Sequence, residues 1–428
     1  MEAGIGAVSW LQRYRLNSFL RSSVWLPPLL GMVAALLLSP LIRKLDLILG
    51  WQAVVGPDSA RALLAALSSS MLTFIVFVFS ILLVAVQLAS AQLTPRIISL
   101  VYRRPVLKFS LTFFVFAFTY TLSALSRIED SVPQISLWVA VYSSVICIGL
   151  FVYMIDHTGK SLRPVSVLTL VGNQGQKVIR EVYPRPVAGT EDTPTNVALL
   201  HQGDVSRTVA SGRTGAVLAF DVTGLVELAR RADCLIELIP QVGDFVTRGD
   251  PLFRLHRGGE AMTDRQLRES VAIGPERTMQ QDPAFAFRIV VDIASKALSP
   301  AINDPTTGVL ALDQIHRLLR TVAGRQLDTG RVNDGAGKLR LAYRTPDWED
   351  FVSLSVTEIR HFGRESIQIV RRMRALLENL IKVVPPQRAA LLRAELDLLS
   401  RGADHDFRDP EDRVRAASAD SLGVGGAP

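Results

Sequence analysis

The stretch at residues 297–310, ALSPAINDPTTGVL, concentrates side chains that could do chemistry. Nucleophilic catalysis by Ser299 needs a base within reach, and the nearest histidine in the sequence, His316, is a full helix away. A metal ion needs more oxygen ligands than Asn303 and Asp304 supply. The residue types therefore give little support to catalysis or metal binding at this stretch.

Helix ends explain the same residues more simply. Asp304 directly precedes Pro305, which predicts an aspartate N-cap followed by a proline in the first helical turn. The preceding helix should end at Ser299, because a residue before proline disfavours the α conformation. Asp282 and Pro283 repeat the capping pattern at the start of that preceding helix.

A third interpretation of the stretch is anion binding, because the first N–H groups of a helix are free and attract negative charge. The side chains that could complete such a site are Arg277, Arg288, Asn303, Thr306 and Thr307. The six histidines show no metal-ligand spacing, and the two cysteines imply no disulfide framework. We expect no catalytic residue, no metal, no cofactor and no enzymatic activity.

The first third of the chain has the composition of a membrane domain. Hydrophobic residues make up 49% of the 428 residues, and the excess lies before Asp156. A membrane-spanning helix needs about 20 apolar residues. The predicted spans are residues 22–42, 62–93, 109–125 and 135–155. Basic residues gather at the N-terminus and in the loop after the second span, so the positive-inside rule places both termini in the cytoplasm.

A polar stripe marks the second span. Thr73, Ser80, Gln87 and Thr94 recur every seven residues, and Ser90 falls close to the same face. Such a stripe either lines a hydrated path or packs against another helix, because serine, threonine and glutamine commonly join membrane helices. The third span carries a similar set, which favours a packed hairpin of the two spans: Thr112, Thr119, Ser123 and Ser126.

Charged residues are placed outside the four predicted spans. No Asp, Glu, Lys, Arg or His lies well inside any of them. Coupled transporters usually carry an ionisable residue at that depth. The pattern therefore speaks against proton- or ion-coupled transport, although it permits a passive pore.

The rest of the chain predicts a cytosolic α+β region. Residues 156–195 read as a connecting helix and linker, 196–258 as a small β-barrel, 259–402 as an α+β domain and 403–428 as a disordered tail. The phrase VGDFV at residues 242–246 resembles the barrel-sandwich fold of biotinyl and lipoyl carriers. No lysine occurs between Lys177 and Lys296, so this region cannot carry their swinging arm.

Residues 345–374 contain a predicted helix start and a basic surface. Thr345 before Pro346 predicts another N-cap. The late helices carry arginines that we expect on a solvated face or against acidic lipid headgroups and neighbouring subunits: Arg360, Arg364, Arg371, Arg372 and Arg374. They lack interleaved aromatic residues, and no nucleic-acid motif occurs, so we expect no nucleic-acid partner.

Two long motifs resemble a family of predicted bacterial membrane proteins of unknown function. They are VFSILLVAVQLASAQLTPRIISL at residues 78–100 and QQDPAFAFRIVVDIASKALSPAINDPTTGVLALD at residues 280–313. The resemblance implies an integral inner-membrane protein with a cytosolic C-terminal region. It implies no reaction, substrate or catalytic residue.

The sequence thus predicts a four-helix membrane bundle followed by a cytosolic α+β region with a small barrel-sandwich-like β-domain. Its partners should be the lipid bilayer and further copies of the same chain. The first functional hypothesis is an oligomeric channel or pore-like protein whose second span lines the path. The alternative is a membrane-anchored sensor or scaffold whose cytosolic region binds a partner or a small anion.

Overall fold

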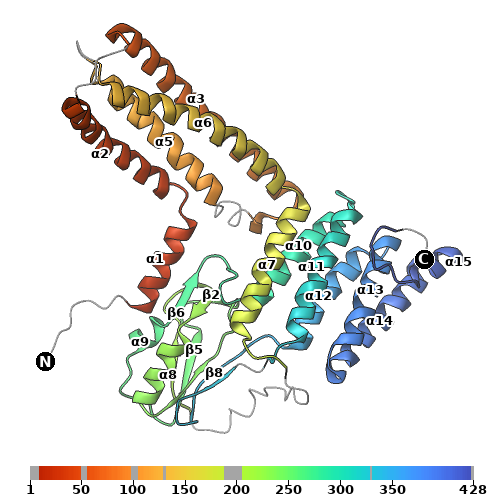
Figure 1. The fold of residues 1–428 in the computed structure, drawn as a ribbon. Helices are drawn as coiled ribbons and strands as arrows, with labels where there is room; N and C mark the ends of the chain where they lie inside the picture. Colours follow the sequence, from red (N-terminus) through yellow and green to blue (C-terminus); the bar gives the residue numbers. More distant parts are fainter. Residues whose placement is uncertain are drawn as a thin grey trace. The chain divides into compact units, whose positions relative to one another are not determined.

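The computed structural model describes residues 9–49, 55–97, 105–128, 132–187, 205–327 and 330–425 (Figure 1). The chain divides into two compact units. Asn17–Ser166 form the membrane unit, and Met1–Leu16 together with Val167–Pro428 form the C-terminal unit. Each unit is described by itself.

The membrane unit is helical throughout its described residues. Its elements are α2 (Leu26–Leu49), α3 (Pro57–Gln92), the short 3-10 helix η1 (Pro95–Ile97), α5 (Pro105–Leu125) and α6 (Gln134–Ser161), and α1 (Trp10–Ser22) crosses the boundary between the units. Three of these, α3, α5 and α6, are long and apolar enough to cross a membrane. The number rises to four if the bent pair of α1 and α2 counts as one span.

The first predicted span, residues 22–42, falls almost entirely on α2, which continues to Leu49. It counts as a candidate span only together with α1, and the two helices are bent by 77° at the break between them. Pro27 and Pro28 explain where α2 begins, because proline is tolerated in the first helical turn and disrupts a helix interior. Pro40 lies inside α2, which nevertheless continues to Leu49.

Helix α5 forms the centre of the membrane unit, since it packs against α2, α3 and α6. Two clusters of buried side chains hold the helices together. One cluster includes Leu64 of α3 and Tyr120 of α5, and the other includes Met71 and Val78 of α3 with Phe114 of α5. Neighbouring helices therefore bury one face of α3 along most of its length.

The described residues of the C-terminal unit form two sheets. The larger sheet has the strand order β1-β5-β3-β8-β7, and the smaller has the order β4-β2-β6. The strands are β1 (Val205–Ala210), β2 (Gly215–Phe220), β3 (Leu235–Leu238), β4 (Phe245–Val246), β5 (Pro251–His256), β6 (Val271–Gly274), β7 (Arg331–Asn333) and β8 (Leu339–Tyr343). Both sheets contribute to one buried core, which includes Val217 of β2, Phe253 of β5 and Leu341 of β8.

This topology corrects the predicted domain boundary at residue 258. The expected small barrel at 196–258 is not closed on itself, because β3 pairs in parallel with β8, with Ile236 opposite Leu341. The smaller sheet crosses the boundary as well, since β2 pairs with β6. The segment described from residue 205 onward therefore shares its sheets with strands from the following block, and no separate barrel-sandwich domain forms.

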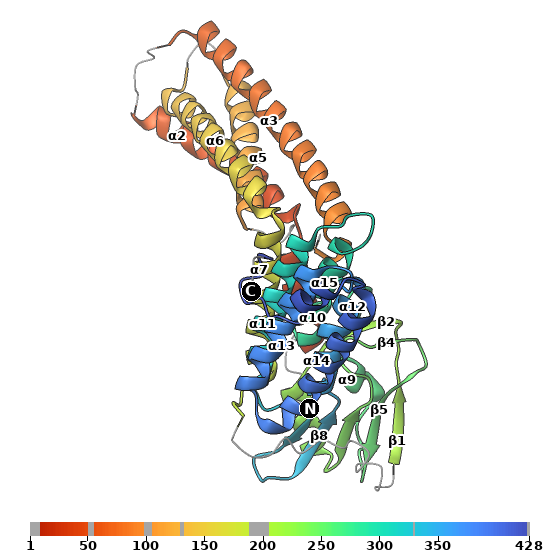
Figure 2. The same ribbon diagram turned by 90° about the vertical axis from the view of Figure 1, so that its right-hand side faces the viewer.

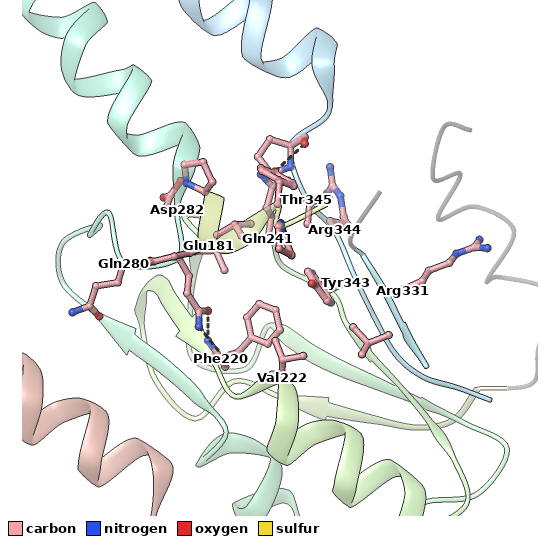
Figure 3. A pocket seen from close by; sticks show the side chains of 18 of the residues that line it. Glu181, Phe220, Val222, Gln241, Gln280, Asp282, Arg331, Tyr343, Arg344 and Thr345 are labelled. Carbon is pink, nitrogen blue, oxygen red and sulfur yellow. Dashed lines mark hydrogen bonds between the residues drawn. The ribbon is translucent and has the colours of Figure 1, made fainter. Parts of the chain in front are cut away.

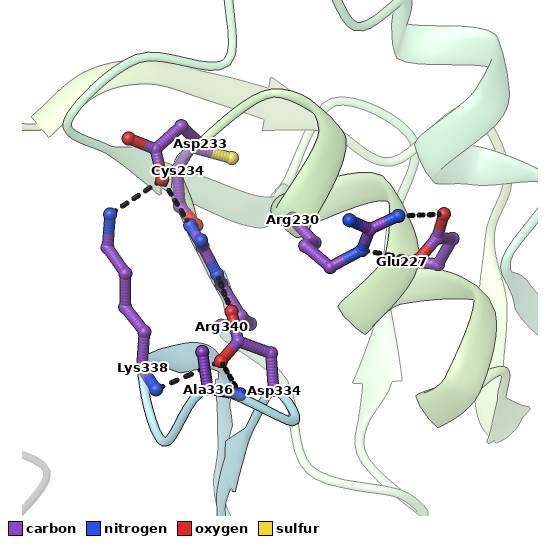
Figure 4. A network of polar contacts seen from close by, with 8 residues as sticks. All are labelled: Glu227, Arg230, Asp233, Cys234, Asp334, Ala336, Lys338 and Arg340. Atoms are coloured by element: carbon purple, nitrogen blue, oxygen red, sulfur yellow. Dashed lines mark hydrogen bonds and ion pairs between the residues drawn. The ribbon is translucent and has the colours of Figure 1, made fainter.

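A charged network lies where β3 begins beside the β7–β8 hairpin (Figure 4). Arg340 is 6% exposed and donates to Asp233 and Asp334, each at 2.7 Å. Lys338 Nζ also lies 2.6 Å from the Asp233 carboxylate. These hydrogen bonds, from Lys338 first and Arg340 second, lower the pKa of Asp233 to about 2. The network joins segments about a hundred residues apart at the parallel strand pair.

The helices of the C-terminal unit follow the strands. They are α7 (Pro164–Val182), α8 (Val222–Arg231), α9 (Asp264–Arg268), α10 (Pro283–Ala297), α11 (Pro305–Ala323), α12 (Trp348–Phe362), α13 (Ile367–Val383), α14 (Pro386–Asp406) and α15 (Pro410–Ala416). Both views show α10 to α14 gathered into one bundle beside the sheets (Figures 1 and 2).

Most predicted caps are confirmed by side-chain hydrogen bonds. Asp282 accepts from the Phe285 N–H, and Asp304 accepts from the Thr307 N–H. The exception is Thr345, because α12 is capped two residues later by Asp347. A capping box in which Asp347 and Asp350 each accept the other's N–H fixes that start.

Helix α7 is held closely against the α10–α11 pair. A Cβ added at Gly175 would lie 2.8 Å from both the Ala286 and the Leu318 side chains. The Gln176 amide also donates to the Thr321 hydroxyl at 2.9 Å. Glycine therefore allows an approach here that a larger residue would prevent.

The tail expected to be disordered is folded through Gly425. Helix α14 continues to Asp406, and α15 follows. Arg371 and Arg374 of α13 donate to the carbonyls of Ser418 and Ala416, and the Asp420 carboxylate accepts three backbone N–H groups of the tail. Arg371, Arg372 and Arg374 are 4%, 5% and 9% exposed, so they are not the solvated basic face that the sequence predicted.

Candidate functional site

The polar stripe of α3 lies on the side of the helix that faces away from the bundle. Met71, Val78 and Ala85 are buried against neighbouring helices and are 1%, 1% and 4% exposed. Thr73 and Ser80 follow two of these residues by two positions, and Gln87 follows Ala85 in the same way; all three are exposed. At about 100° per residue, two positions amount to about 200° around the helix. The stripe is therefore almost opposite the buried face.

The stripe residues differ in how their polar atoms are satisfied. The hydroxyls of Thr73 and Ser80 donate to the carbonyls of Ser69 and Val76 in the preceding turn of the same helix, both at 3.0 Å. The Gln87 side chain has no hydrogen-bond partner among the described residues. The glutamine amide is thus the group on this face that most needs water or a partner helix.

The last two predicted members of the stripe leave the exposed face. Ser90 is half-buried, and Thr94 is 5% exposed and lies beyond the end of α3 at Gln92. Pro95 gives the physical reason, because the residue before a proline disfavours the helical conformation. The seven-residue pattern therefore describes a helix face only from Thr73 to Gln87, a rise of about 21 Å.

The hydroxyl stripe of α5 packs against α2 and does not meet the stripe of α3. Ser123 lies 2.9 Å from the Ser39 hydroxyl of α2, and Arg127 donates to the same Ser39 oxygen at 3.0 Å. A Cβ at Gly31 of α2 would lie 2.6 Å from the Thr112 carbonyl oxygen of α5. Helices α3 and α5 do pack together as the expected hairpin, but through apolar residues such as Val78 and Phe114. The matching of the two polar stripes is corrected, because α5 turns Ser123 toward Ser39 of α2.

The membrane unit contains a buried carboxylate whose role the sequence did not predict. Asp46 is 9% exposed and lies on α2, which extends beyond the predicted end of the first span. Its oxygens accept from the N–H groups of Ile135 and Ser136 at 2.7 and 3.1 Å and from the Ser136 hydroxyl at 2.8 Å. Asp46 therefore caps the start of α6 from another helix, a relationship that local sequence patterns do not reveal.

The residues proposed for an anion site are not brought together. Arg277 precedes α10, whereas Asn303, Thr306 and Thr307 follow its other end. The 15 residues of α10 span about 22 Å. Arg288 lies between the two ends on α10 itself. Five residues spread along one helix in this way cannot contact one small anion.

Both arginines of that set are also engaged by carboxylates. Arg277 donates to Asp282 through Nε and Nη2 at 2.9 and 2.7 Å. Burial raises the pKa of Asp282, and the charge of Arg277 opposes that rise. Arg288 pairs with Asp292 and with Glu358, and the hydrogen bonds that it donates to Glu358 are the main cause that raises the pKa of Arg288. Both guanidinium groups are therefore already paired with carboxylates.

The junction itself is occupied by capping contacts. Asp304 accepts from the Thr307 N–H at 3.1 Å and from its hydroxyl at 2.6 Å, whereas Asn303 and Thr306 are exposed. The Ser299 hydroxyl donates to the Lys296 carbonyl at 2.7 Å. His316 contacts Asn379 and Arg372 through its two ring nitrogens, and burial lowers its pKa. The geometry around the junction is that of helix ends.

Metal-ligand geometry is likewise missing from the described part of the chain. No group of three or more His, Cys, Asp or Glu side chains within it could hold a metal ion. Cys147 and Cys234 are both free and buried. The α3 stripe is therefore the candidate site that the structure presents most clearly within the membrane unit.

Comparison with known proteins identifies the family but no reaction. A family model described as "Predicted membrane protein (DUF2254)" matches residues 21–379. Uncharacterized proteins of Mycobacterium bovis and Mycobacterium tuberculosis are 27% identical over 435 residues, which covers 97% of this chain and 83% of each relative. No solved structure matches the chain. The match extends from α1 to α13, and the chain therefore belongs to the predicted membrane protein family DUF2254.

Proposed function

We propose that the protein assembles through α3 into a homo-oligomer of the bacterial inner membrane and that the α3 stripe lines a hydrated path. The observation that carries the proposal is the placement of Thr73, Ser80 and Gln87 on the exposed face of α3, opposite its buried face. In a single copy this face would contact lipid. Assembly would instead place the polar residues against water or against the polar groups of a second copy.

The energetics favour a polar partner for this face. Burying an unpartnered amide in an apolar medium costs about 2–7 kcal/mol, which is large against the stability of a typical domain. A second copy offers the Gln87 amide a donor and an acceptor at the same depth, and a central path offers water. The seven-residue spacing is also the repeat that keeps one helix face directed toward a supercoiled partner.

The proposed path is passive. No acidic or basic residue occurs on the stripe between Thr73 and Gln87. Asp46, a buried carboxylate of the membrane unit, has its oxygens occupied by the start of α6. Coupled transport usually relies on a buried ionisable residue that is free to exchange its partner.

Flux through liposomes tests the path. Purified full-length protein is reconstituted, and efflux of entrapped K⁺, Cl⁻ and a small neutral sugar is followed over time. We expect efflux of at least one of these solutes, and we expect Gln87→Leu and Ser80→Val to reduce it. Tyr142→Phe provides the matched control, because Tyr142 is an exposed polar residue on α6.

Two results separate the alternatives. Efflux that is equal in the parent protein and in both stripe variants contradicts a path along α3. If the protein forms oligomers but shows no efflux, the stripe packs helices in a dry interface. That result would contradict the hydrated path and would leave the proposed assembly through α3 standing.

A membrane-anchored sensor is the second candidate function. It is favoured by a cavity in the C-terminal unit that is lined in part by the last turn of α7. Helix α7 directly follows α6 in the chain, so a ligand in the cavity would touch the segment that continues from the last span. Ligand binding to the full-length protein tests this candidate, as described for the cavity below.

A further inference from the structure

A cavity of about 630 Å³ lies in the C-terminal unit (Figure 3). Its walls come from the end of α7, the β2–α8 junction, the β3–β4 turn, the segment before α10 and the ends of β7 and β8. This volume is within the range of about 300–1,000 Å³ that is typical of small-molecule sites.

The floor of the cavity is aromatic and apolar. The Phe220 and Tyr343 rings meet edge to face with centroids 4.8 Å apart at 67°. Val222 and Val242 extend this surface. Phe220 is 4% exposed, so the half-buried Tyr343 ring is the aromatic surface that a planar ligand would contact.

Hydrogen bonds hold the walls in place without a ligand. The Gln281 amide accepts from the Phe220 N–H at 3.0 Å and donates to the Phe220 carbonyl at 3.3 Å. The Tyr183 hydroxyl donates to the Pro346 carbonyl at 3.1 Å. Asp282 is engaged by the start of α10 and by Arg277. The cavity is therefore formed before binding, which reduces the entropic cost of association.

The rim carries unbalanced positive charge. The side chains of Arg185, Arg331 and Arg344 are exposed and make no hydrogen bond or ion pair within the described ranges. The acidic lining residues have cationic neighbours, since Glu181 lies 3.9 Å from Lys177 and Asp282 lies 2.7 Å from Arg277. Figure 3 shows Arg344 on the wall above Tyr343 and Arg331 at the outer edge. An anionic ligand would neutralise this excess.

Two amide side chains complete the lining. Gln241 and Gln280 are half-buried, and neither side chain has a hydrogen-bond partner among the residues described. An amide can donate and accept at once, which suits the mixed edge of a nucleobase. Arginine forks match phosphate oxygens geometrically and bind them through charge-assisted hydrogen bonds.

We propose that this cavity binds a nucleoside phosphate. The base packs against the Tyr343 ring, the amide of Gln241 contacts its polar edge, and the phosphate pairs with arginines of the rim. The proposal gives the sensor candidate its ligand class and rests on that candidate. It is independent of assembly through α3.

Titration calorimetry on the full-length protein in detergent tests the proposal. The probes are the monophosphates of adenosine, guanosine, cytidine and uridine, the corresponding nucleosides, inorganic phosphate and benzoate. At least one monophosphate should bind, and its nucleoside should bind about tenfold or more weakly, because a charge-assisted hydrogen bond contributes about 1.5–3 kcal/mol. Inorganic phosphate alone should not compete at equal concentration.

Variants locate the bound nucleotide. Arg344→Gln and Gln241→Leu should each weaken binding by about tenfold. Arg248→Gln is the matched control, because Arg248 is an exposed arginine on the β4–β5 turn outside the cavity lining. Unchanged affinity in both cavity variants places the nucleotide elsewhere and overturns the proposal.

Two further outcomes separate this inference from the sensor function. Binding of benzoate without any monophosphate overturns the nucleotide class and leaves a sensor of aromatic carboxylates. Absence of binding by every probe overturns the nucleotide proposal and removes the observation that favours the sensor. Neither outcome affects the α3 stripe.

Discussion

Ser80 follows Val78 by two positions on α3, yet Val78 is 1% exposed in the bundle while Ser80 is exposed on the opposite face. This pair shows how one helix serves two environments. The Val78 face holds the membrane unit together, and the Ser80 face is available to a neighbouring copy.

The two faces should respond differently to the same small change. Val78→Ala removes two buried methyl groups and should cost about 1–2 kcal/mol of unfolding free energy. Ser80→Ala removes an exposed hydroxyl that bonds its own helix, so the change should stay within about 0.5 kcal/mol. Thermal unfolding of the two variants in detergent measures the difference. Equal losses would contradict the difference in burial between the two faces.

Close packing of α2 and α5 depends on Gly31. Gly31→Ala should lower the melting temperature, because the new methyl group would lie 2.6 Å from the Thr112 carbonyl oxygen, a backbone atom that cannot turn aside. Gly149→Ala on α6 is the control, since a Cβ there meets nothing within 4 Å. Alanine should stabilise that helix by up to about 1 kcal/mol. A neutral effect at Gly31 would contradict the α2–α5 contact.

The cap of α6 depends on the Asp46 carboxylate. Asp46→Asn keeps the shape of the side chain but removes its charge and one of the two oxygens that accept from the Ile135 and Ser136 N–H groups. We therefore expect a loss of about 1–2 kcal/mol in unfolding free energy. Asp58→Asn tests the same substitution at an exposed site, because the Asp58 side chain is 99% exposed. If both variants melt alike, Asp46 does not hold the two helices together.

Acid should weaken the β3–β8 junction through Asp233. Its folded-state pKa is lowered to about 2 by Lys338 and Arg340, whereas its ordinary value is 3.8. A lowered carboxyl pKa contributes stability that is present above the ordinary value and is lost as the pH falls toward the folded value. Stability should therefore decline between about pH 4 and pH 2.

Asp233→Asn should flatten part of this acid dependence. Unfolding of the parent and the variant is followed by circular dichroism across that pH window. Asp404→Asn serves as the control, because Asp404 is exposed and has no ion pair within the described ranges. An identical acid profile in the parent and Asp233→Asn would contradict the role of the network.

Local patterns predicted the helix starts well and the distant contacts poorly. The caps at Asp282 and Asp304 depend on an N–H three residues away, so the sequence contains the whole interaction. The cap at Asp46 acts on residues about ninety positions later. Arg374 binds a carbonyl of the tail about forty positions later. No periodicity links such partners.

The candidate site shows the same division. The seven-residue spacing of Thr73, Ser80 and Gln87 was visible in the sequence, because helix geometry fixes which residues share a face. Whether that face is covered depends on the neighbouring helices, and Met71 and Val78 on the other side are the residues that they bury. The rim arginines Arg185 and Arg344 come from segments far apart in the chain and meet at the cavity only after folding.

Disulfide cross-linking in native membranes tests assembly through α3 most directly. Thr73→Cys, Ser80→Cys and Gln87→Cys are introduced singly into the parent protein, whose own Cys147 and Cys234 are 0% and 2% exposed. We expect mild oxidation to yield a cross-linked dimer from each stripe variant and none from Ile146→Cys on the exposed face of α6. No dimer from the three stripe variants, or equal dimer from Ile146→Cys, would contradict assembly through this face.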